Sequence, residues 1–307
     1  MRLDIVVLDG GPRVAPLLER LDVRPWQMLL RDGSSCLAIW DDLWSDFLGD
    51  ENGARGARVL VRDAVDAREL EMVGGTRWRI EADPRPHRGT AGVVRDLRDT
   101  GSIGVDADWI AVVEASASPA VELGGLVDLL VREESSVVLG ASELDRFCGV
   151  LLLRPAVLDL VPEVGFCDLK EQLIPVAREK GSRLDSVVIA ERALRVNELS
   201  GALASVAALA GGEEASNAAG STAPRVLAHG PSAISESATC AGASIISSIV
   251  FEDAFIEPGA IVARSIVGPG AIVSSGMVLS DSVLSSSDRG QRELAARLST
   301  TSGAVDA

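Results

Sequence analysis

The carboxyl-terminal part of the chain repeats a short pattern every 17 residues. One column of this repeat holds Gly242, Gly259 and Gly276. Four further columns hold the same kind of residue in each copy: Ser248, Ser265 and Ser282; Ile249, Ile266 and Val283; Val250, Val267 and Leu284; and Ile245, Val262 and Leu279. Short β-branched pairs separated by Gly, Pro and Ser turns are typical of a coil that alternates strands and corners. The pattern therefore predicts about three stacked coils with Val and Ile pointing into a shared interior.

A stack of so few coils leaves apolar ends and sides exposed. Contiguous exposed apolar surface commonly marks a contact with another chain. We therefore expect residues 231–286 to hold the chain in a homo-oligomer or to bind a paralogue. The alternative for the same residues is a Gly- and Ser-rich tail whose periodicity is accidental.

Composition places the domain boundaries. Residues 211–230 begin with GGEEASNAAGSTAP, which holds no large apolar residue and is typical of a flexible linker. They separate an amino-terminal domain, residues 1–210, from the coils in residues 231–286. Residues 287–307 fit a short helix followed by a tail of small residues.

The amino-terminal domain alternates buried strand runs with helical stretches. Strands are expected at residues 3–8, 58–61, 109–113, 137–139 and 149–153, and helices at residues 36–47, 123–133 and 169–180. This order predicts an α/β domain with a mostly parallel, Rossmann-like sheet. Ligands of such sheets bind at the carboxyl ends of the strands. Gly10 and Gly11, directly after the first strand, are therefore the first candidates for a binding loop.

The charge balance limits the partners that the chain can have. The formal net charge of −16 repels nucleic acid and anionic lipid surfaces. No apolar run is long enough to cross a membrane, and the first residues fit a strand better than a signal peptide, so we expect a cytoplasmic protein with no nucleic-acid or membrane partner. Lys170 and Lys180 are the only lysines, so phosphate binding before them would need arginine, backbone amides or a metal. The four cysteines are widely spaced, which favours free thiols over zinc ligands.

Three segments carry an ordered set of motifs. They are Leu8-Asp9-Gly10-Gly11 with the following Arg13-Val14-Ala15-Pro16-Leu17; Arg88-Gly89-Thr90-Ala91-Gly92-Val93; and Phe166 to Pro175. These motifs precede the 17-residue repeat, which itself resembles the hexapeptide repeats of β-helix proteins. Together they resemble the sugar-1-phosphate nucleotidyltransferases, which include mannose-1-phosphate guanylyltransferases and glucose-1-phosphate thymidylyltransferases. The resemblance covers most of the chain. It implies that the coils form a left-handed parallel β-helix.

The resemblance also implies roles for individual residues. In the family, glycine amides and an arginine of the first loop hold the nucleotide phosphates, and the second segment lies against the base and sugar. The residues that this assigns to binding a nucleotide or nucleotide-sugar are Gly10, Gly11, Arg13, Gly89, Thr90, Ala91, Gly92 and Lys170. The candidates for catalysis are Arg13, Glu114 and Asp168, with magnesium as the cofactor if the chain is active.

Several positions depart from the family pattern. Trp26 stands where the family has a lysine that neutralises phosphate charge, and Ser116 stands where it has a magnesium-binding aspartate. Glu114 lies two residues before Ser116 and is a candidate substitute. Residues 140–146, which correspond to a lysine segment that contacts the sugar phosphate, contain no lysine.

The departures favour a chain that has kept the scaffold and lost much of the chemistry. The second metal carboxylate of the family is not recognisable, and Asn197 and Glu198 both stay open as its position. Our leading hypothesis is a diverged nucleotidyltransferase homologue, weakly active or inactive, that binds a nucleotide or nucleotide-sugar as a regulatory or assembly subunit.

Two alternatives stay open. The first is an active enzyme that makes a nucleotide-sugar from a nucleoside triphosphate and a sugar 1-phosphate with a rebuilt site of Arg13, Arg24, Arg88, Glu114 and Asp168. The second is an acyltransferase, because many β-helix proteins transfer acyl groups with a histidine base. Its only candidate bases are His87 and His229.

Overall fold

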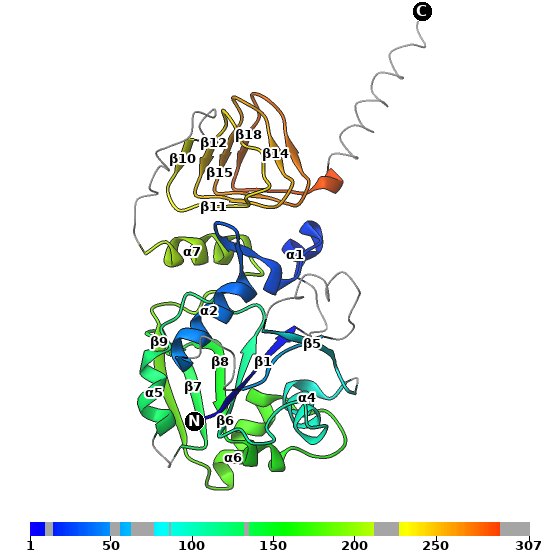
Figure 1. Ribbon diagram of the computed structural model, residues 1–307, viewed down its shortest axis with the longest axis vertical. Helices are drawn as coiled ribbons and strands as arrows, with labels where there is room; N and C mark the ends of the chain where they lie inside the picture. Colours follow the sequence, from blue (N-terminus) through cyan, green and yellow to red (C-terminus); the bar gives the residue numbers. More distant parts are fainter. Residues whose placement is uncertain are drawn as a thin grey trace, which may run out of the picture. The chain divides into compact units, whose positions relative to one another are not determined.

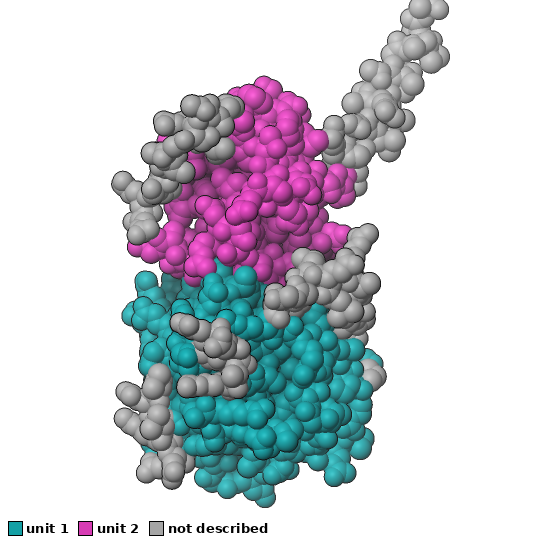
Figure 2. Space-filling view, viewed as in Figure 1, with its two compact units in different colours: residues 1–12, 37–194 teal, residues 13–36, 195–307 magenta. Residues whose placement is uncertain are grey.

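The computed structural model describes residues 1–9, 15–49, 56–62, 77–85, 87–131, 135–211 and 227–288 (Figure 1). Its contacts divide the chain into two units (Figure 2): Met1–Pro12 with Leu37–Leu194, and Arg13–Cys36 with Arg195–Ala307. Residues 13–36, which the composition placed in the amino-terminal domain, thus belong to the same unit as the repeats. Most of the predicted linker and tail, residues 212–226 and 289–307, lies outside the described residues.

A seven-stranded sheet forms the centre of the first unit (Figure 1). In spatial order its strands are β5 (Arg79–Ala82), β4 (Arg58–Arg62), β1 (Leu3–Asp9), β6 (Trp109–Glu114), β8 (Phe147–Leu153), β7 (Val137–Ser142) and β9 (Leu184–Ala190). All neighbouring pairs are parallel except those of β8, which runs antiparallel to β6 and β7. β1, β6 and β8 are buried along nearly their whole length, as expected of a sheet that is covered on both faces.

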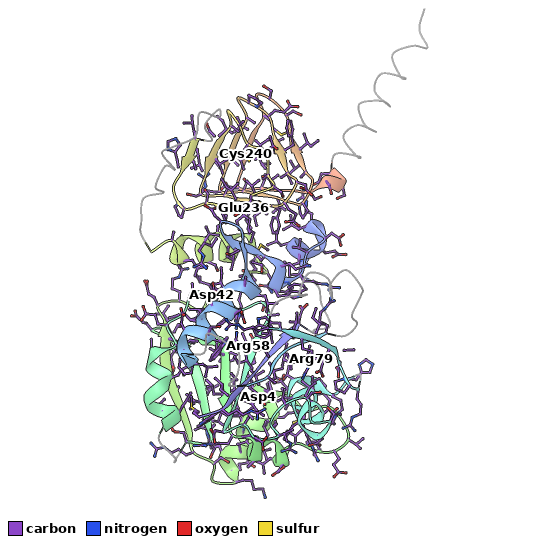
Figure 3. The ribbon with its side chains drawn as sticks, viewed as in Figure 1. Asp4, Asp42, Arg58, Arg79, Glu236 and Cys240 are labelled. Atoms are coloured by element: carbon purple, nitrogen blue, oxygen red, sulfur yellow. The ribbon has the colours of Figure 1, made fainter. Side chains whose placement is uncertain are left out.

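Helices cover both faces of this sheet. The helical elements are α2 (Cys36–Leu48), α4 (Gly89–Asp99), α5 (Gly124–Val131), the 3-10 helix η2 (Pro155–Leu160), the π-helix η3 (Leu169–Leu173) and α6 (Ile174–Glu179). Val59 of β4 faces a core that contains residues of α4, η2, η3 and α6. The preceding residue, Arg58, which Figure 3 labels, faces the other side and donates to Asp41 of α2. On that second side, the indole of Trp109 donates to the carbonyl of Leu130 in α5 at 3.3 Å.

Short parallel strands stack into three sheets in the second unit (Figure 1). The first sheet contains β10 (Leu227–His229), β12 (Ser244–Ile246), β15 (Ile261–Ala263) and β18 (Val278–Ser280); the second contains β11 (Ala233–Ile234), β13 (Ile249–Val250), β16 (Ile266–Val267) and β19 (Val283–Leu284); the third contains β14 (Phe255–Ile256) and β17 (Ile272–Val273). Ile245 pairs with Val262, and Val262 pairs with Leu279, so each coil matches one sequence repeat. These side chains belong to one buried apolar interior.

The second sheet of the β-helix is covered on its outer face. Ile249 and Ile266 lie outside the interior cluster of the coils, yet both are fully buried. The covering segment contains α1 (Pro16–Leu21), the 3-10 helix η1 (Pro25–Gln27) and the hairpin β2 (Leu29–Arg31) and β3 (Ser34–Ser35), and β2 also contacts α7 (Leu199–Leu209). β2 packs against β11 and β13, and α1 packs against β19. Residues 13–36 therefore complete the β-helix unit.

The predicted fold class is confirmed. A mostly parallel α/β sheet precedes stacked parallel sheets of short strands, an arrangement consistent with a left-handed β-helix. Among the residues described above, no helix combines the length and apolar character that a membrane span requires.

Candidate ligand site at the carboxyl edge of the sheet

Charged residues end three neighbouring strands of the first unit. Asp9 is the last residue of β1, Arg62 is the last residue of β4, and Glu114 is the last residue of β6. Because these strands are parallel, the three residues lie at the carboxyl edge, where α/β sheets bind ligands. Arg62 Nε lies 3.2 Å from Asp9 Oδ2, and both side chains are almost completely buried. The edge therefore contains one fixed and largely buried ion pair.

A second ion pair lies at the same edge. Lys170 Nζ donates to Glu114 Oε1 at 2.8 Å, and both side chains are partly exposed, 48% for the lysine and 32% for the glutamate. The ammonium group also lies 5.0 Å from the ring centroid of Phe147. Phe147 begins the antiparallel strand β8, so its start lies at the carboxyl edge of β6. The structure thus brings together the predicted site residues Glu114 and Lys170.

Asp168 fixes the backbone next to Lys170. Its Oδ1 accepts from the amides of Lys170 at 2.8 Å and Glu171 at 3.0 Å, and its Oδ2 accepts from the hydroxyl of Thr90 at 2.9 Å. The amide of Leu169 in turn donates to Thr90 Oγ1 at 2.9 Å. Burial alone would raise the pKa of Asp168, but these hydrogen bonds and the charge of Lys170 outweigh it and hold the pKa below its usual value. Asp168 is therefore an ionised helix cap that ties η3 to α4.

The predicted binding segment at residues 88–93 forms the start of α4, and its amides bond to another loop of the protein. The sequence pattern alone did not predict this contact. The amides of Ala91 and Gly92 both donate to the carbonyl oxygen of Cys167, at 3.0 and 3.3 Å. Gly89 has a φ of +72°, and a Cβ there would lie 2.6 Å from the same oxygen. The glycine is needed because the loop before η3 approaches the start of the helix so closely.

Arg88 has a comparable role in holding this loop. Its buried guanidinium pairs with Asp96, Nε to Oδ2 at 3.0 Å, and donates to the carbonyls of Gly165 at 2.5 Å and Pro162 at 2.9 Å. Arg85 Nε also donates to Asp96, at 2.9 Å. Arg88 thus connects α4 to the loop at residues 161–168. Its guanidinium N–H groups are engaged in these contacts and would have to leave them to bind a phosphate.

The other predicted site residues are distributed over both units. Gly10, Gly11 and Arg13 lie outside the described residues. Ser116 is half-buried in the turn after β6, and His87, with a φ of +62°, comes shortly before α4. The remaining candidates belong to the second unit: Arg24 and the buried Trp26 at η1, Asn197 and Glu198 before α7, and the exposed His229 at the end of β10.

The described residues do not fit a magnesium site at this edge. Asp9 pairs with Arg62, Glu114 pairs with Lys170, and the oxygens of Asp168 accept from two amides and a hydroxyl. Within the ranges that the structure describes, no three His, Cys, Asp or Glu side chains are grouped to hold a metal ion.

Sequence reasoning did not identify the pair formed by Asp9 and Arg62. A signal was present, because both residues directly follow apolar strand runs, and parallel strands bring their carboxyl ends together. Phe147 was also missed, since an aromatic residue at the start of a strand is more often part of a core.

Comparisons of the chain with models of known protein families and with curated proteins found no match.

Proposed function

We propose that the chain is a diverged homologue of the sugar-1-phosphate nucleotidyltransferases that binds a nucleotide or nucleotide-sugar at the carboxyl edge of its sheet. In this proposal nucleotidyl transfer is weak or absent, and the chain acts as a regulatory or assembly subunit. The observation that carries it is the pairing of Glu114 with Lys170 at 2.8 Å. Glu114, the candidate substitute for the missing metal-binding aspartate, neutralises the lysine of the candidate site.

The chemistry of nucleotidyl transfer explains why this pairing matters. The reaction commonly needs a metal held by carboxylates, together with cations around the phosphate groups. Losing one such stabilising group costs on the order of 10²–10³ in rate. Here Trp26 and Ser116 replace two such groups, and Glu114 faces an ammonium group. A nucleotide can still bind through its base and sugar when these groups are missing, because binding does not require the charge to be stabilised as the bond breaks.

The alternative of an active enzyme with a rebuilt site is less well supported. Arg88 would have to leave Asp96 and two backbone carbonyls to reach a phosphate. Asp168 would have to give up the hydrogen bonds that cap η3. Both moves would break the link between α4 and the following loop. For acyl transfer, no contact between His87 or His229 and another residue that the structure describes favours the role of a base.

A measurement of the Tm with and without candidate ligands tests the proposed function. The protein is heated with GTP, dTTP, UTP and their sugar conjugates, each with and without magnesium. We expect at least one of these to raise the Tm by about 5–10 °C at a concentration roughly 100 times its Kd, because the ligand binds the native state only. The effect should persist without magnesium. The same measurement is made on Lys170→Gln. Lys180→Gln, which changes the other lysine of the chain, is its matched control.

The two lysine variants should differ. Lys170→Gln should reduce the ligand-induced rise in Tm, and Lys180→Gln should leave it near the wild-type value. The proposal is contradicted if none of these nucleotides or conjugates stabilises the wild-type protein.

A further inference from the structure

We infer that Lys170 is an anion subsite that Glu114 occupies in the ligand-free protein. A phosphate group of a ligand would bind Lys170 Nζ by displacing the Glu114 carboxylate. This inference rests on the proposed function for its ligand, because it names the group that would hold the phosphate of a nucleotide at the same edge.

The position of Lys170 is fixed by contacts that do not involve Glu114. Its amide donates to Asp168 Oδ1 at 2.8 Å, and Asp168 is itself held by Thr90. The ammonium group lies against the face of Phe147, 5.0 Å from the ring centroid. A cation over an aromatic ring is stabilised there without a carboxylate. The lysine should therefore keep its place when Glu114 moves away.

The two carboxylates near Lys170 have different surroundings. Both oxygens of Asp168 accept hydrogen bonds from other residues, so this carboxylate is part of the scaffold. Glu114 ends β6 and is about one-third exposed, and its carboxylate meets Lys170 at the surface of the protein. Displacing Asp168 would uncap η3, so the partly exposed Glu114 is the carboxylate that a ligand would displace.

The displacement is energetically reasonable because exposed ion pairs contribute little to stability. A phosphate group carries more negative charge than a carboxylate and offers three acceptor oxygens. It can therefore compete for Lys170 although Glu114 has the advantage of being in the same molecule. Glu114 in turn would make the site selective for ligands whose phosphate binds strongly enough to displace it.

Calorimetric titration with inorganic pyrophosphate in magnesium-free buffer tests this inference. Glu114→Gln keeps the shape of the side chain and removes the competing charge, so it should bind pyrophosphate roughly 3- to 10-fold more tightly than the wild type. Lys170→Gln should lose most of the binding. Glu143→Gln is the matched control, because Glu143 is an exposed carboxylate that directly follows β7 at the same edge. It should bind like the wild type.

The wild-type protein provides a second readout that does not depend on a variant folding. Isotope labelling of lysine gives side-chain NMR signals from Lys170 and Lys180 alone, since the sequence contains no other lysine. Pyrophosphate should move the signal of Lys170 and leave that of Lys180 in place. An unmoved Lys170 signal, or a Glu114→Gln variant that binds no more tightly than Glu143→Gln, overturns the inference.

The outcomes separate this inference from the proposed function. If nucleotides stabilise the wild type but pyrophosphate leaves Lys170 unchanged, the subsite is wrong and nucleotide binding stands. If pyrophosphate binds as expected but no nucleotide or nucleotide-sugar stabilises the protein, Lys170 is an anion subsite and the proposed function fails.

Discussion

At the scale of single residues, several positions that the sequence predicts to bind a ligand hold the protein together. Asp168 caps η3, Thr90 bridges that helix to α4, and Arg88 holds the loop between them. A family motif fixes both the fold of a loop and the groups that it presents to a ligand. The first of these roles can persist when the second is lost, because packing and hydrogen bonding still constrain the residue.

Replacing Asp168 with asparagine should show its structural role. Because the pKa of Asp168 is lowered in the folded protein, its charge stabilises the fold above the pKa of the unfolded chain, about 3.9. This contribution is lost as the pH falls through the lower folded pKa. We expect Asp168→Asn to lower the free energy of unfolding by up to about 1 kcal/mol at pH 7, because asparagine can still cap the helix but lacks the charge and the second acceptor oxygen that Thr90 and the two amides bond to. The difference from the wild type should shrink as the pH falls below about 4.

Urea denaturation of both proteins between pH 7 and pH 3 measures this effect. Glu143→Gln, at an exposed carboxylate, should follow the wild type at every pH. A difference between Asp168→Asn and the wild type that stays constant over this range would contradict the assigned role of the charge.

At the scale of elements, a ladder of serines supports the β-helix. The hydroxyl of Ser248 accepts from the amide of Ser265, and the hydroxyl of Ser265 accepts from the amide of Ser282, each at 3.1 Å. The Ser265 hydroxyl also donates to the carbonyl of Ala263 at 2.7 Å. The serine column of the repeat thus connects successive coils at one corner.

Removing one serine from the middle of the ladder should destabilise the β-helix. Ser265 is fully buried, and Ser265→Ala would leave the amide of Ser282 and the carbonyl of Ala263 without this partner. We expect a loss of about 1–3 kcal/mol in the free energy of unfolding. Ser282→Ala removes the same group from the last coil and should cost less, because its hydroxyl is only half-buried. Equal Tm values for the two variants would contradict the ladder.

The repeat and the central strands could be predicted because their residues are buried, and burial leaves apolar runs or a periodic apolar pattern in the sequence. All five expected strands are present, and Ile245, Val262 and Leu279 do point into the coils. The edge strands β5 and β9 were not predicted. β5 has the sequence RIEA and shows no continuous apolar run, whereas β9 contains the short apolar run at residues 187–190, which was a signal that sequence reasoning missed. The burial of Ile249 and Ile266 on the outer face of the second sheet could not be predicted either, because the residues that cover them are far away in the sequence.

Only some residues of the candidate site were named from the sequence, and none of their pairings was. Glu114, Asp168, Thr90 and Lys170 were identified one by one from the resemblance. Which carboxylate meets which cation depends on side-chain directions at the ends of strands from different parts of the sequence. A linear pattern does not contain that information.

At the scale of the whole molecule, the first sheet of the β-helix carries exposed apolar residues at one register position. This position holds Leu227, Ser244, Ile261 and Val278 on successive strands, and its three apolar residues, Leu227, Ile261 and Val278, are 53%, 37% and 65% exposed. Exposed apolar surface of this kind supports the expectation of a homo-oligomer or a paralogue partner. A charge at this register position should weaken such a contact without disturbing the interior of the coils.

Light scattering of a Val278→Glu variant tests this expectation. The wild type should have at least twice the monomer mass of 32.0 kDa, and the variant should shift toward the monomer mass at the same protein concentration. Its Tm, measured at low concentration, should change by less than about 2 °C, because the replaced side chain is exposed. If the contact is with a paralogue, the wild type alone will be monomeric and will gain mass only when the paralogue is added. A Val278→Glu variant that keeps the wild-type mass in both settings would contradict the role of these exposed residues.

The most direct test of the account is a pyrophosphate-exchange assay on the full chain. Labelled pyrophosphate is incubated with nucleotide-sugars that stabilise the protein, in the presence of magnesium. Because the described edge does not fit a magnesium site, the account predicts exchange at or barely above the protein-free rate. Robust magnesium-dependent exchange would contradict it and would show that the chain assembles a working site from other groups.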